Sequence, residues 1–542
     1  MDAEEFRKRG KEMIDFVANY LENIDELKVF PQVEPGYLHK MISADPPIKP
    51  EEWDNIMNEG NSVIMPGITH WHHPHFHAYF PAANSYAAMC GDILSGGIGC
   101  IGFTWASSPA CTELEVVMMD WLAKMLQLPK DFLSESGTGG GVIYNTCSEA
   151  TFVALLAARN KAIEFRRKEN LNEDQYTIMS KLVGYYSDQF PKAHSSVERA
   201  GLLSMIKMRE VKSIKRKMRG SVLQEMIKED LENGFYPFYC VATLGTTGSC
   251  AFDSLDEIGP ICEAHQIWLH VDAAYAGSAL ICQEYRHLLD GIEYAMSFVF
   301  NPHKWMLSNC EIRETNNPLR KFMLSIYPTF LGSRDAIKRM QVCQEKLLCA
   351  WAESFEEYSN KGRHIIESLP SIQFKDSRFV VETFTVDPVY LKHKKEGKCP
   401  DFRHWHIQLG RRFRSLKIWF VLRLYGVDGI QKYIRNHIKL AHLFEKLMLG
   451  DDRFEIVEEV TMGLVCFRLK GNNEINKELY SRIEGDGRIH IVTSEFSDTD
   501  TLYLRFAVCY QFATEDHVKY AYGTIIDITN QMDLCSDLFL EK

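Results

Sequence analysis

The sequence predicts an α/β fold with a mostly parallel central sheet. From about residue 85 to 310, helical stretches alternate with short apolar runs. Thr112–Met125 and Glu149–Phe165 have helical periodicity, whereas Tyr236–Thr243 and Ile267–Val271 have the length and composition of buried strands. This alternation is typical of layered α/β proteins, because each crossover helix returns the chain to a further parallel strand.

Residues 1 to about 30 predict an amphipathic helix. Met13, Val17, Tyr20 and Ile24 recur at helical spacing. An apolar stripe on a short terminal segment must be buried, either against the same chain or against a partner subunit. The proline-rich stretch 31–50 that follows has the composition of a connection.

After about residue 415 the pattern changes to that of a small α+β domain. Helical stretches at Arg414–Leu424 and Ile430–Leu449 are joined by short strands at Gly463–Leu469 and Thr501–Val508. We therefore expect three parts: an N-terminal helical segment at 1–84, a large domain at 85–415 and a small C-terminal domain at 416–542.

Composition excludes several classes of protein. The 542 residues need more than one core, and 46% apolar with 25% charged residues is an ordinary globular mixture. A net charge of −12 argues against nucleic acid or an anionic membrane as the main partner. No apolar stretch approaches the roughly 20 residues that a bilayer requires. The acidic N-terminus is unlike a signal peptide and the fifteen cysteines are scattered singly, so we expect reduced thiols and a cytoplasmic protein.

A glycine-rich run, Ser136–Gly141, precedes Cys147, Ser148 and a helix that starts near Glu149. Glycines let backbone N–H groups approach an anion, and a helix N-terminus adds positive potential, so this stretch is a candidate phosphate cradle. A turn between two elements would have the same composition, and both interpretations stay open.

Two charged residues follow apolar runs. Asp272 ends the run Ile267–Val271, where open α/β sheets bind ligands, although aspartate is also a good helix N-cap. Lys304 lies between His303 and Trp305, where partial burial would favour the neutral amine that attacks a carbonyl; a lysine snorkelling at a sheet edge is the alternative. Together, an anion cradle, an aspartate that keeps a pyridine nitrogen protonated and an imine-forming lysine are the parts that a pyridoxal phosphate enzyme needs.

Longer motifs carry a family resemblance. They are His70-Trp71, Phe76–Pro81, Ala193–Arg199, His270–Gly277, Asn301–Trp305 and Leu409–Arg414. These motifs resemble the group II pyridoxal phosphate decarboxylases, and within that family they are most similar to the aromatic-L-amino-acid (dopa) decarboxylases, particularly those of insects. The likeness extends from the first residues to about 525, with one long interruption.

The resemblance implies a type I aminotransferase-like fold and a homodimer whose N-terminal helices embrace the partner, with the active site at the subunit interface. It implies that Lys304 forms a Schiff base with pyridoxal 5′-phosphate, that Asp272 pairs with the ring nitrogen and that His194 stacks on the ring. Tyr390 would lie on a mobile loop that closes over the site and protonates the substrate carbon. Other implied cofactor contacts are Cys147, Ser148, Thr247, Ala274, Asn301 and His303. The implied substrate pocket consists of Trp71, Tyr79, Phe80, Pro81, Ala82, His194 and Gly410, with Ile101 and Phe103 from the partner subunit.

Five residues bear on the choice of substrate and product. Gly410 leaves room for a catechol or an indole, which favours decarboxylation of dopa to dopamine and of 5-hydroxytryptophan to serotonin. The alternative is an aromatic acetaldehyde synthase, which couples decarboxylation to oxidative deamination. His194 and the pair Tyr79-Phe80 match the simple decarboxylases, and Tyr390 agrees with them.

The sequence also departs from the family pattern. About Glu311 to Phe374 is unmatched, contains a helical-looking stretch at Asp335–Tyr358 and is expected to displace a strand of the large sheet. Smaller departures are the extra Phe190-Pro-Lys192, Tyr144-Asn145 in place of Gln-Gly, Ala82 in place of a threonine and Gln408 in place of a proline. These changes keep open a second hypothesis, a cofactor-binding paralogue with impaired catalysis.

A cluster of histidines offers an alternative of another kind. His70, His72, His73, His75 and His77 could bind zinc or copper. His70 and His77 already belong to the decarboxylase-like motifs, and no cysteine or carboxylate supports the other three. We therefore expect no metal site.

Overall fold

The computed structural model describes residues 1–188, 195–309, 311–312, 366–367, 370–386, 397, 399–496 and 498–532. The chain divides into two compact units, one formed by Met1–Asn309 with Leu369–Lys542 and the other by Cys310–Ser368. Within the described ranges, no helix has both the length and the apolar character that crossing a membrane would require.

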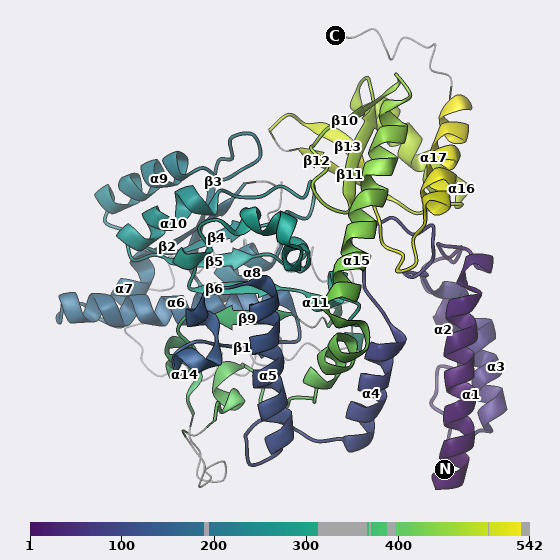
Figure 1. Ribbon diagram of the computed structural model, residues 1–542, viewed down its shortest axis with the longest axis horizontal. Coiled ribbons are helices and arrows are strands. Elements are labelled where there is room, and N and C mark those ends of the chain that lie inside the picture. Colours follow the sequence, from purple (N-terminus) through teal and green to yellow (C-terminus); the bar gives the residue numbers. More distant parts are fainter. Residues whose placement is uncertain are drawn as a thin grey trace. The chain divides into compact units, whose positions relative to one another are not determined.

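The larger unit is built around a seven-stranded sheet (Figure 1). Its strands are β1 (Gly140–Ile143), β2 (Leu182–Ser187), β3 (Lys207–Val211), β4 (Tyr236–Thr243), β5 (Trp268–Asp272), β6 (Ser297–Phe300) and β9 (Ser371–Phe374). They are ordered β1-β9-β6-β5-β4-β2-β3. The pairs β2–β3, β2–β4, β4–β5 and β5–β6 are parallel, and β9 is antiparallel to both its neighbours. The predicted α/β class and its mostly parallel sheet are confirmed.

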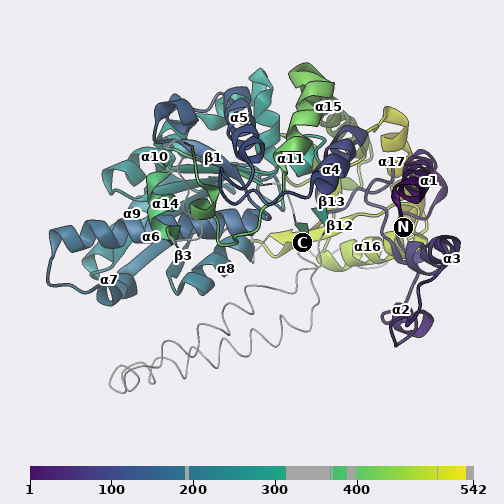
Figure 2. The same cartoon turned by 90° about the horizontal axis from the view of Figure 1, so that it is seen from below.

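Helices cover both faces of this sheet (Figure 2). The helices of this part of the chain are α4 (Tyr86–Ile98), which packs against the later helix at Ser415–Leu449, α5 (Pro109–Leu126), α6 (Cys147–Glu169), α7 (Gln175–Lys181), α8 (Ser195–Ser204), α9 (Gly220–Glu232), α10 (Leu255–Ala264), the short α11 (Pro302–Trp305) and α14 (Arg378–Phe384). Along β4, Cys240 and Ala242 belong to a core cluster with α5, α9 and α10, while Tyr239 and Val241 belong to a second cluster with α6, α8 and α14. Successive side chains of a strand point to opposite faces, which explains why β4 is apolar throughout.

Strand β9 corrects the expectation that the unmatched segment displaces a strand of the sheet. Ser371–Phe374 were assigned to that segment, yet all four residues are buried and pair with β1 on one side and β6 on the other. Ile372 and Phe374 are fully buried in the core beside α6. The sheet is therefore continuous beside the strand that leads to Lys304.

The C-terminal part contains a four-stranded antiparallel sheet. Its strands are β10 (Phe454–Ile456), β11 (Leu464–Leu469), β12 (Val492–Phe496) and β13 (Thr501–Ala507), ordered β10-β11-β13-β12, and its helices are α15 (Ser415–Leu449), α16 (Asn473–Asp486) and α17 (Glu515–Asn530). Helix α15 is broken at Gly426, where φ is 65° and ψ is 172°, a conformation that only glycine adopts readily. The two predicted helices of this region therefore lie on either side of Gly426.

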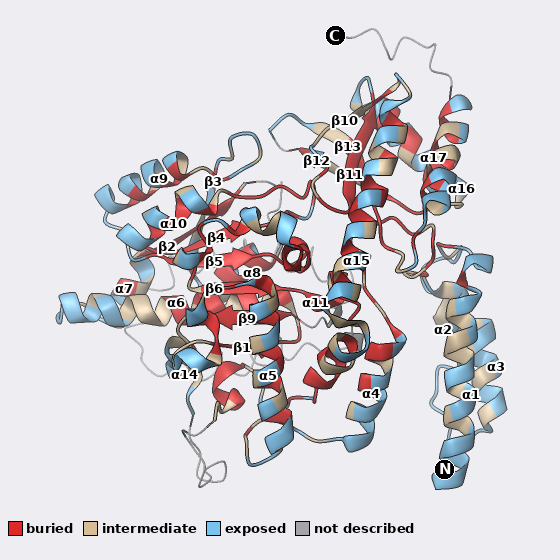
Figure 3. Ribbon diagram, in the orientation of Figure 1, coloured by how far each residue is buried: buried red, intermediate tan, exposed pale blue. Residues whose placement is uncertain are grey.

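The N-terminal part is helical, as predicted. It contains α1 (Ala3–Glu22), α2 (Tyr37–Met41) and α3 (Trp53–Glu59). The Asp2 carboxylate caps α1 by accepting from the backbone N–H groups of Glu4 and Glu5. No residue of α1 is buried, as Figure 3 shows, so its apolar stripe is only partly covered by the rest of the chain.

In the smaller unit, β7 (Glu311–Ile312) pairs antiparallel with β8 (Ile366–Glu367). The predicted helical stretch Asp335–Tyr358 and the extra residues 190–192 lie outside the described residues. The predicted domain boundaries, 1–84, 85–415 and 416–542, stay a prediction.

Candidate active site

Lys304 lies one short turn beyond the central strand β6. Asn301 caps the turn α11 and Pro302 occupies its first position, where a missing N–H costs nothing. The Lys304 backbone N–H donates to the Asn301 carbonyl at 3.0 Å. The lysine is half-buried, and its Nζ lies 5.6 Å from the centroid of the Phe80 ring. It is therefore not a fully solvated surface charge.

Asp272 is at the end of β5, the strand next to β6. Asp272 pairs with Val299 in the parallel register, and beyond the strands the Asn301 N–H donates to the Ala274 carbonyl at 3.1 Å. The Asp272 side chain is buried and accepts from the Ala274 N–H at 3.0 Å. Because the carboxyl ends of parallel strands meet at one edge, the aspartate and the lysine segment share the edge at which such sheets bind ligands.

Cys147 begins helix α6 at the same edge. Its Sγ donates to Asn301 Oδ1 at 2.9 Å. Burial raises the pKa of the Cys147 thiol, the Asp272 carboxylate raises it further, and Lys304 and Asn301 oppose these effects. Asp272, Lys304 and Asn301 thus all affect the pKa of the buried Cys147 thiol. The first turn of α6 therefore lies beside all three residues.

The next residue, Ser148, contacts helix α8. Its Oγ lies 2.6 Å from Ser196 Oγ, and the Thr146 side chain caps α6 by accepting from the Glu149 N–H at 3.0 Å. The N-terminal N–H groups of a helix and its dipole together attract an anion. The start of α6 is therefore the candidate phosphate site.

The glycine-rich run 136–141 is not that phosphate site. Of the two interpretations of this run, a phosphate cradle and a turn between two elements, the structure favours the turn. Gly140 and Gly141 lie in β1, at the strand end opposite to α6. A Cβ at Gly139 would meet the Asp131 carbonyl oxygen at 1.9 Å, and one at Gly141 would meet Gln373 Oε1 at 2.4 Å. These glycines allow close backbone packing rather than anion binding.

The segment around residues 79–85 lies against the lysine turn. The Ala83 N–H donates to the His303 carbonyl at 2.5 Å, and Ser85 Oγ donates to the Leu307 carbonyl at 2.7 Å. Phe80 and Pro81 are buried, Ala82 is half-buried, and the Tyr79 ring is stacked on Trp71 with centroids 5.2 Å apart. The structure therefore brings Phe80 and its neighbours to Lys304; their place in a substrate pocket stays a prediction.

Burial also sets the protonation of His303. Its pKa lies well below the usual value because the ring is buried and because the Lys304 charge is near. The imidazole is therefore neutral at physiological pH. His194 and Tyr390, the other two residues expected to handle protons, lie outside the described residues.

Arg505 is a site residue that our sequence analysis missed. Its buried guanidinium donates to the carbonyls of Thr247 at 2.6 Å, Gly248 at 2.9 Å and Tyr79 at 3.3 Å. It fixes the turn of Thr247, whose own side chain is exposed, relative to the Tyr79-Phe80 segment. An arginine in the apolar strand 501–507 was the available signal, because such a charge needs buried partners.

Ile101, Phe103 and Gly410 form a second group, on two loops bonded to each other. The Gly102 N–H donates to the Arg411 carbonyl at 3.0 Å, and the Arg403 N–H donates to the Phe103 carbonyl at 2.9 Å. Ile101 is 54% exposed, and a Cβ at Gly410 would meet no atom within 4 Å. Within one chain, both loops thus present an open surface.

The histidines of the 70–77 segment have separate partners. His70 Nδ1 lies 2.8 Å from Tyr20 Oη, His73 Nε2 lies 3.1 Å from the Leu27 carbonyl oxygen, and His77 Nδ1 lies 3.1 Å from the Ala507 carbonyl oxygen. The described part of the chain contains no group of three His, Cys, Asp or Glu side chains that could hold a metal ion.

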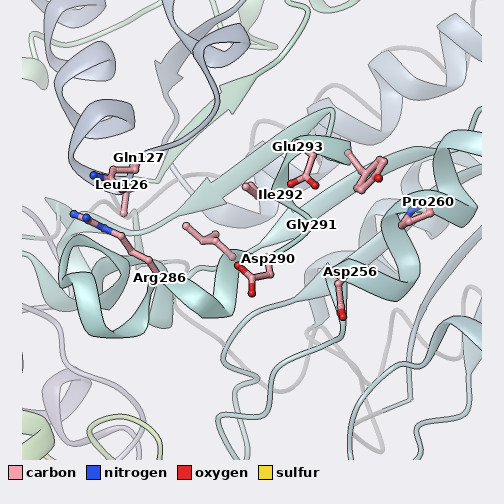
Figure 4. Close-up of a pocket in the computed structure, with 11 residues that line it drawn as sticks. Leu126, Gln127, Asp256, Pro260, Arg286, Asp290, Gly291, Ile292 and Glu293 are labelled. Atoms are coloured by element: carbon pink, nitrogen blue, oxygen red, sulfur yellow. The ribbon is translucent and has the colours of Figure 1, made fainter.

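A cavity of about 540 Å³ lies elsewhere, between the end of α5, helix α10 and the turn around Gly291 (Figure 4). Asp256, Arg286 and Asp290 are among the residues that line it, and none of the predicted site residues does so. It is therefore not part of the cluster around Lys304.

The groups around Lys304 fit pyridoxal 5′-phosphate. An amine can take the aldehyde, a buried carboxylate can face the ring nitrogen, and a helix N-terminus can bind the phosphate. The fold and the site are thus those of a pyridoxal phosphate enzyme.

Comparison with known proteins narrows this class. The chain matches the family described as "Pyridoxal-dependent decarboxylase conserved domain" over residues 35–315 and 349–470, and it belongs to that family. It is 49% identical to the aromatic-L-amino-acid decarboxylase of Drosophila melanogaster over 534 residues, covering 98% of this chain and 92% of the relative. It is 48% identical to that of Mus musculus over 536 residues, covering 98% and 99%. Among solved structures, Oryza sativa TDC with PLP and tryptamine has a TM-score of 0.83 at 33% identity, covering 98% of this chain and 99% of the other.

Proposed function

We propose that the chain decarboxylates aromatic L-amino acids with pyridoxal 5′-phosphate, converting dopa to dopamine and 5-hydroxytryptophan to serotonin. The observation that carries this proposal is the convergence of Lys304, Asp272 and the start of α6 at one edge of the sheet. Identity of 48–49% to aromatic-L-amino-acid decarboxylases over nearly the whole chain supports the substrate class.

Each residue has a distinct task. The bound cofactor supplies an aldehyde for the substrate amine and a ring that accepts the electrons left when carbon dioxide departs. Lys304 holds the aldehyde between turnovers, and Asp272 keeps the ring nitrogen protonated. Ser148 and the N–H groups at the start of α6 bind the phosphate, with Cys147 and Asn301 packed beside them.

The remaining roles follow the family resemblance. By that resemblance, Thr247, Ala274 and His303 would lie around the bound cofactor, His194 would contact its ring, and Tyr390 would supply the proton that the substrate carbon takes up. The aromatic substrate is enclosed by Trp71, Tyr79, Phe80, Pro81, Ala82 and Gly410, with Ile101 and Phe103 of the second subunit. The aromatic rings offer flat apolar surfaces that suit a catechol or an indole.

We further infer a homodimer with the active site at its interface. Phe6 and Ile14 on α1 are 65% and 56% exposed, and Ile93 on α4 is 60% exposed. Exposed apolar residues gathered on helices that the chain itself does not cover are expected at a subunit interface. The open surface around Ile101 fits a residue that completes the partner's pocket.

A cytoplasmic location is also part of the proposal. All eleven cysteines in the described part of the chain are free thiols, and eight of them are buried. A reducing compartment keeps thiols in this state.

Borohydride reduction of the holoenzyme, followed by peptide mapping, tests the cofactor assignment. The label is expected on Lys304 and is lost in Lys304→Ala. Lys161→Met, which removes another partly buried lysine, is the control and keeps the label. Labelling of a different lysine would refute the assignment.

Product analysis tests the reaction. Incubation with dopa is expected to yield carbon dioxide and dopamine in equal amounts without hydrogen peroxide. Aldehyde with peroxide would instead indicate an acetaldehyde synthase, and absence of any product from cofactor-loaded protein would indicate an impaired paralogue.

Mixing two inactive variants tests the interface. If Ile101 serves the partner's site, a heterodimer of Lys304→Ala and Ile101→Asp subunits contains one site with both native residues. Random reassociation then restores up to about a quarter of wild-type activity. No recovery from mixtures that sedimentation shows to be dimeric would contradict a shared site.

A further inference from the structure

Two positions at which the chain departs from the family pattern are joined by a hydrogen bond. Asn145 Nδ2 donates to Gln408 Oε1 at 2.9 Å, across 263 residues of sequence. Asn145 is 6% exposed and Gln408 is half-buried. A hydrogen bond between side chains that are largely removed from water is costly to break, because the donor left behind loses its partner without regaining full hydration.

On one side, Asn145 is rigidly connected to the start of α6. Its backbone N–H donates to Glu149 Oε2 at 3.2 Å, while the Glu149 N–H donates to the Thr146 hydroxyl at 3.0 Å. These two bonds close the first turn of the helix in the manner of a capping box. A displacement of Asn145 would therefore carry Cys147 and Ser148 with it.

The residue before Asn145 lies along the same partner segment. Tyr144 is fully buried, its hydroxyl donates to the Trp405 carbonyl at 2.5 Å, and its ring centroid lies 4.4 Å from that of His406. Tyr144 and Asn145 thus contact 405–408 over two successive residues, and of the two only Asn145 forms a hydrogen bond to a side chain of that segment.

On the other side, Gln408 is two residues from Gly410 on a loop that is fixed beyond that glycine. Arg411 is buried and forms an ion pair with the buried Glu115, whose Oε1 also accepts from the Ile143 N–H at 2.9 Å. The loop is therefore anchored at Arg411, and Gln408 anchors its other flank.

We propose that Asn145 and Gln408 are positioning residues that lock the phosphate-binding start of α6 to the loop of Gly410, and so raise the affinity for the cofactor's phosphate group. The proposal rests on the proposed function, in which Ser148 and the N-terminus of α6 bind that phosphate. An anion gains most from a helix N-terminus when the N–H groups are held in a fixed direction, which is what the bond to Gln408 provides.

Binding of pyridoxal 5′-phosphate and of pyridoxal to the apoprotein, followed by tryptophan fluorescence, separates this role from a merely structural one. Both ligands carry the aldehyde and the ring, and only one carries the phosphate. Asn145→Ala and Gln408→Ala are each expected to weaken pyridoxal 5′-phosphate binding about fivefold, the effect of one lost hydrogen bond, and to leave pyridoxal binding unchanged. Because the two side chains act through each other, the double variant is expected to lose no more than either single variant.

Asn160→Ala is the matched control. Asn160 lies on the same helix, and its Nδ2 donates to Thr383 Oγ1 at 3.2 Å, so its removal deletes a similar bond away from the helix N-terminus. This variant is expected to lose thermal stability and to keep the ratio of the two affinities. Equal weakening of both ligands, additive losses in the double variant or an unchanged ratio in Gln408→Ala would each overturn the proposal.

The binding assay does not require turnover, so the role of Asn145 and Gln408 can be tested separately from the proposed function. Tight cofactor binding without decarboxylation would refute the proposed function and leave the role of the pair measurable. If the protein is a decarboxylase but substitution of Asn145 and Gln408 leaves the ratio of its affinities for pyridoxal 5′-phosphate and pyridoxal unchanged, only the role of this pair is refuted. Failure of the wild-type protein to bind pyridoxal 5′-phosphate would overturn both.

Discussion

The ring of Phe80 stacks on the ring of Tyr275, with centroids 3.8 Å apart and planes inclined by 19°. Tyr275 stacks in turn on Trp305 at 4.7 Å, and Lys304 Nζ lies 5.6 Å from the centroid of Phe80. Three sequence segments thus meet in one stack, namely the proposed substrate segment, the turn after Asp272 and the turn that carries Lys304. The stack holds the lysine at a fixed distance from the substrate side of the site.

Removal of the middle ring should damage both stability and the site. Tyr275 is 1% exposed, and Tyr275→Ala is expected to lower the free energy of unfolding by about 3–5 kcal/mol, the usual cost of deleting a buried aromatic ring. It should also reduce kcat/KM, because Phe80 and Trp305 lose their common support. Tyr275→Phe keeps the ring and is expected to retain most of both properties. Urea unfolding and steady-state kinetics of the two variants test this, and an alanine variant as stable as the phenylalanine variant would contradict it.

A buried histidine next to this stack should make the protein sensitive to acid. His437 is fully buried, its Nδ1 accepts from Trp305 Nε1 at 3.2 Å, and burial lowers its pKa to about 4. The unfolded chain has the ordinary value of about 6.5. Above pH 6.5 neither state binds the proton. Between pH 6.5 and 4 only the unfolded state does, so stability falls by up to about 3 kcal/mol as the pH decreases.

Urea unfolding between pH 7.5 and 4.5 measures this dependence. The slope of the unfolding free energy against pH gives the number of protons that the chain takes up when it unfolds. Below pH 6 this number should be smaller by about one in His437→Gln, because one group that binds a proton only on unfolding is gone. An unchanged slope would show that His437 is protonated to the same extent in both states.

Gly410 should affect substrate choice and leave folding unaffected. Because a Cβ at this position meets no atom within 4 Å, Gly410→Ser is expected to change stability by no more than about 0.5 kcal/mol. If the residue lines the aromatic pocket, the added hydroxymethyl group should lower kcat/KM for dopa and 5-hydroxytryptophan by about tenfold or more. Gly485→Ser, on α16, also enters open space and serves as the control. Equal kinetics in both variants would remove Gly410 from the pocket.

An element of the fold was predictable from the sequence where the residue pattern of that one segment was sufficient to identify it. The predicted strand Tyr236–Thr243 is β4 residue for residue, because a buried parallel strand is apolar along its entire length. Strand β9 was missed, since its four residues have too short a pattern and the strand is defined by its pairing with β1 and β6.

The candidate site, like the fold, was predictable from the sequence only in part. Lys304 and Asp272 could be identified because each follows an apolar run that becomes a strand of the central sheet. The glycine-rich run was ambiguous, since glycines that bind anions and glycines that permit close packing have the same composition. The bond between Asn145 and Gln408 joins two loops 263 residues apart, and no local pattern in either loop specifies it.

The unmatched segment gives the last prediction, in which two deletions are compared. The family match stops at residue 315 and resumes at 349, so residues 349–374, which we expected to be unmatched, do have counterparts in the family, and β9 at 371–374 is among them. Deletion of 316–348, with a short flexible linker in its place, leaves β9 in the chain. This variant is expected to fold, to bind the cofactor and to keep activity within a few-fold of the full chain, because residues without a counterpart in the family are not required by the family's reaction.

Deletion of 311–374 should instead abolish folding. It removes Ile372 and Phe374 from the core, each worth several kcal/mol, and it separates β1 from β6. It also removes Gln373, whose Nε2 donates to the Met119 carbonyl at 2.8 Å and whose side chain fills the space left by Gly141. Circular dichroism and cofactor content of the two purified variants distinguish the cases. If the shorter deletion also fails to fold, residues 316–348 are part of this protein's own structure; if it folds and gains activity, that segment restrains the enzyme.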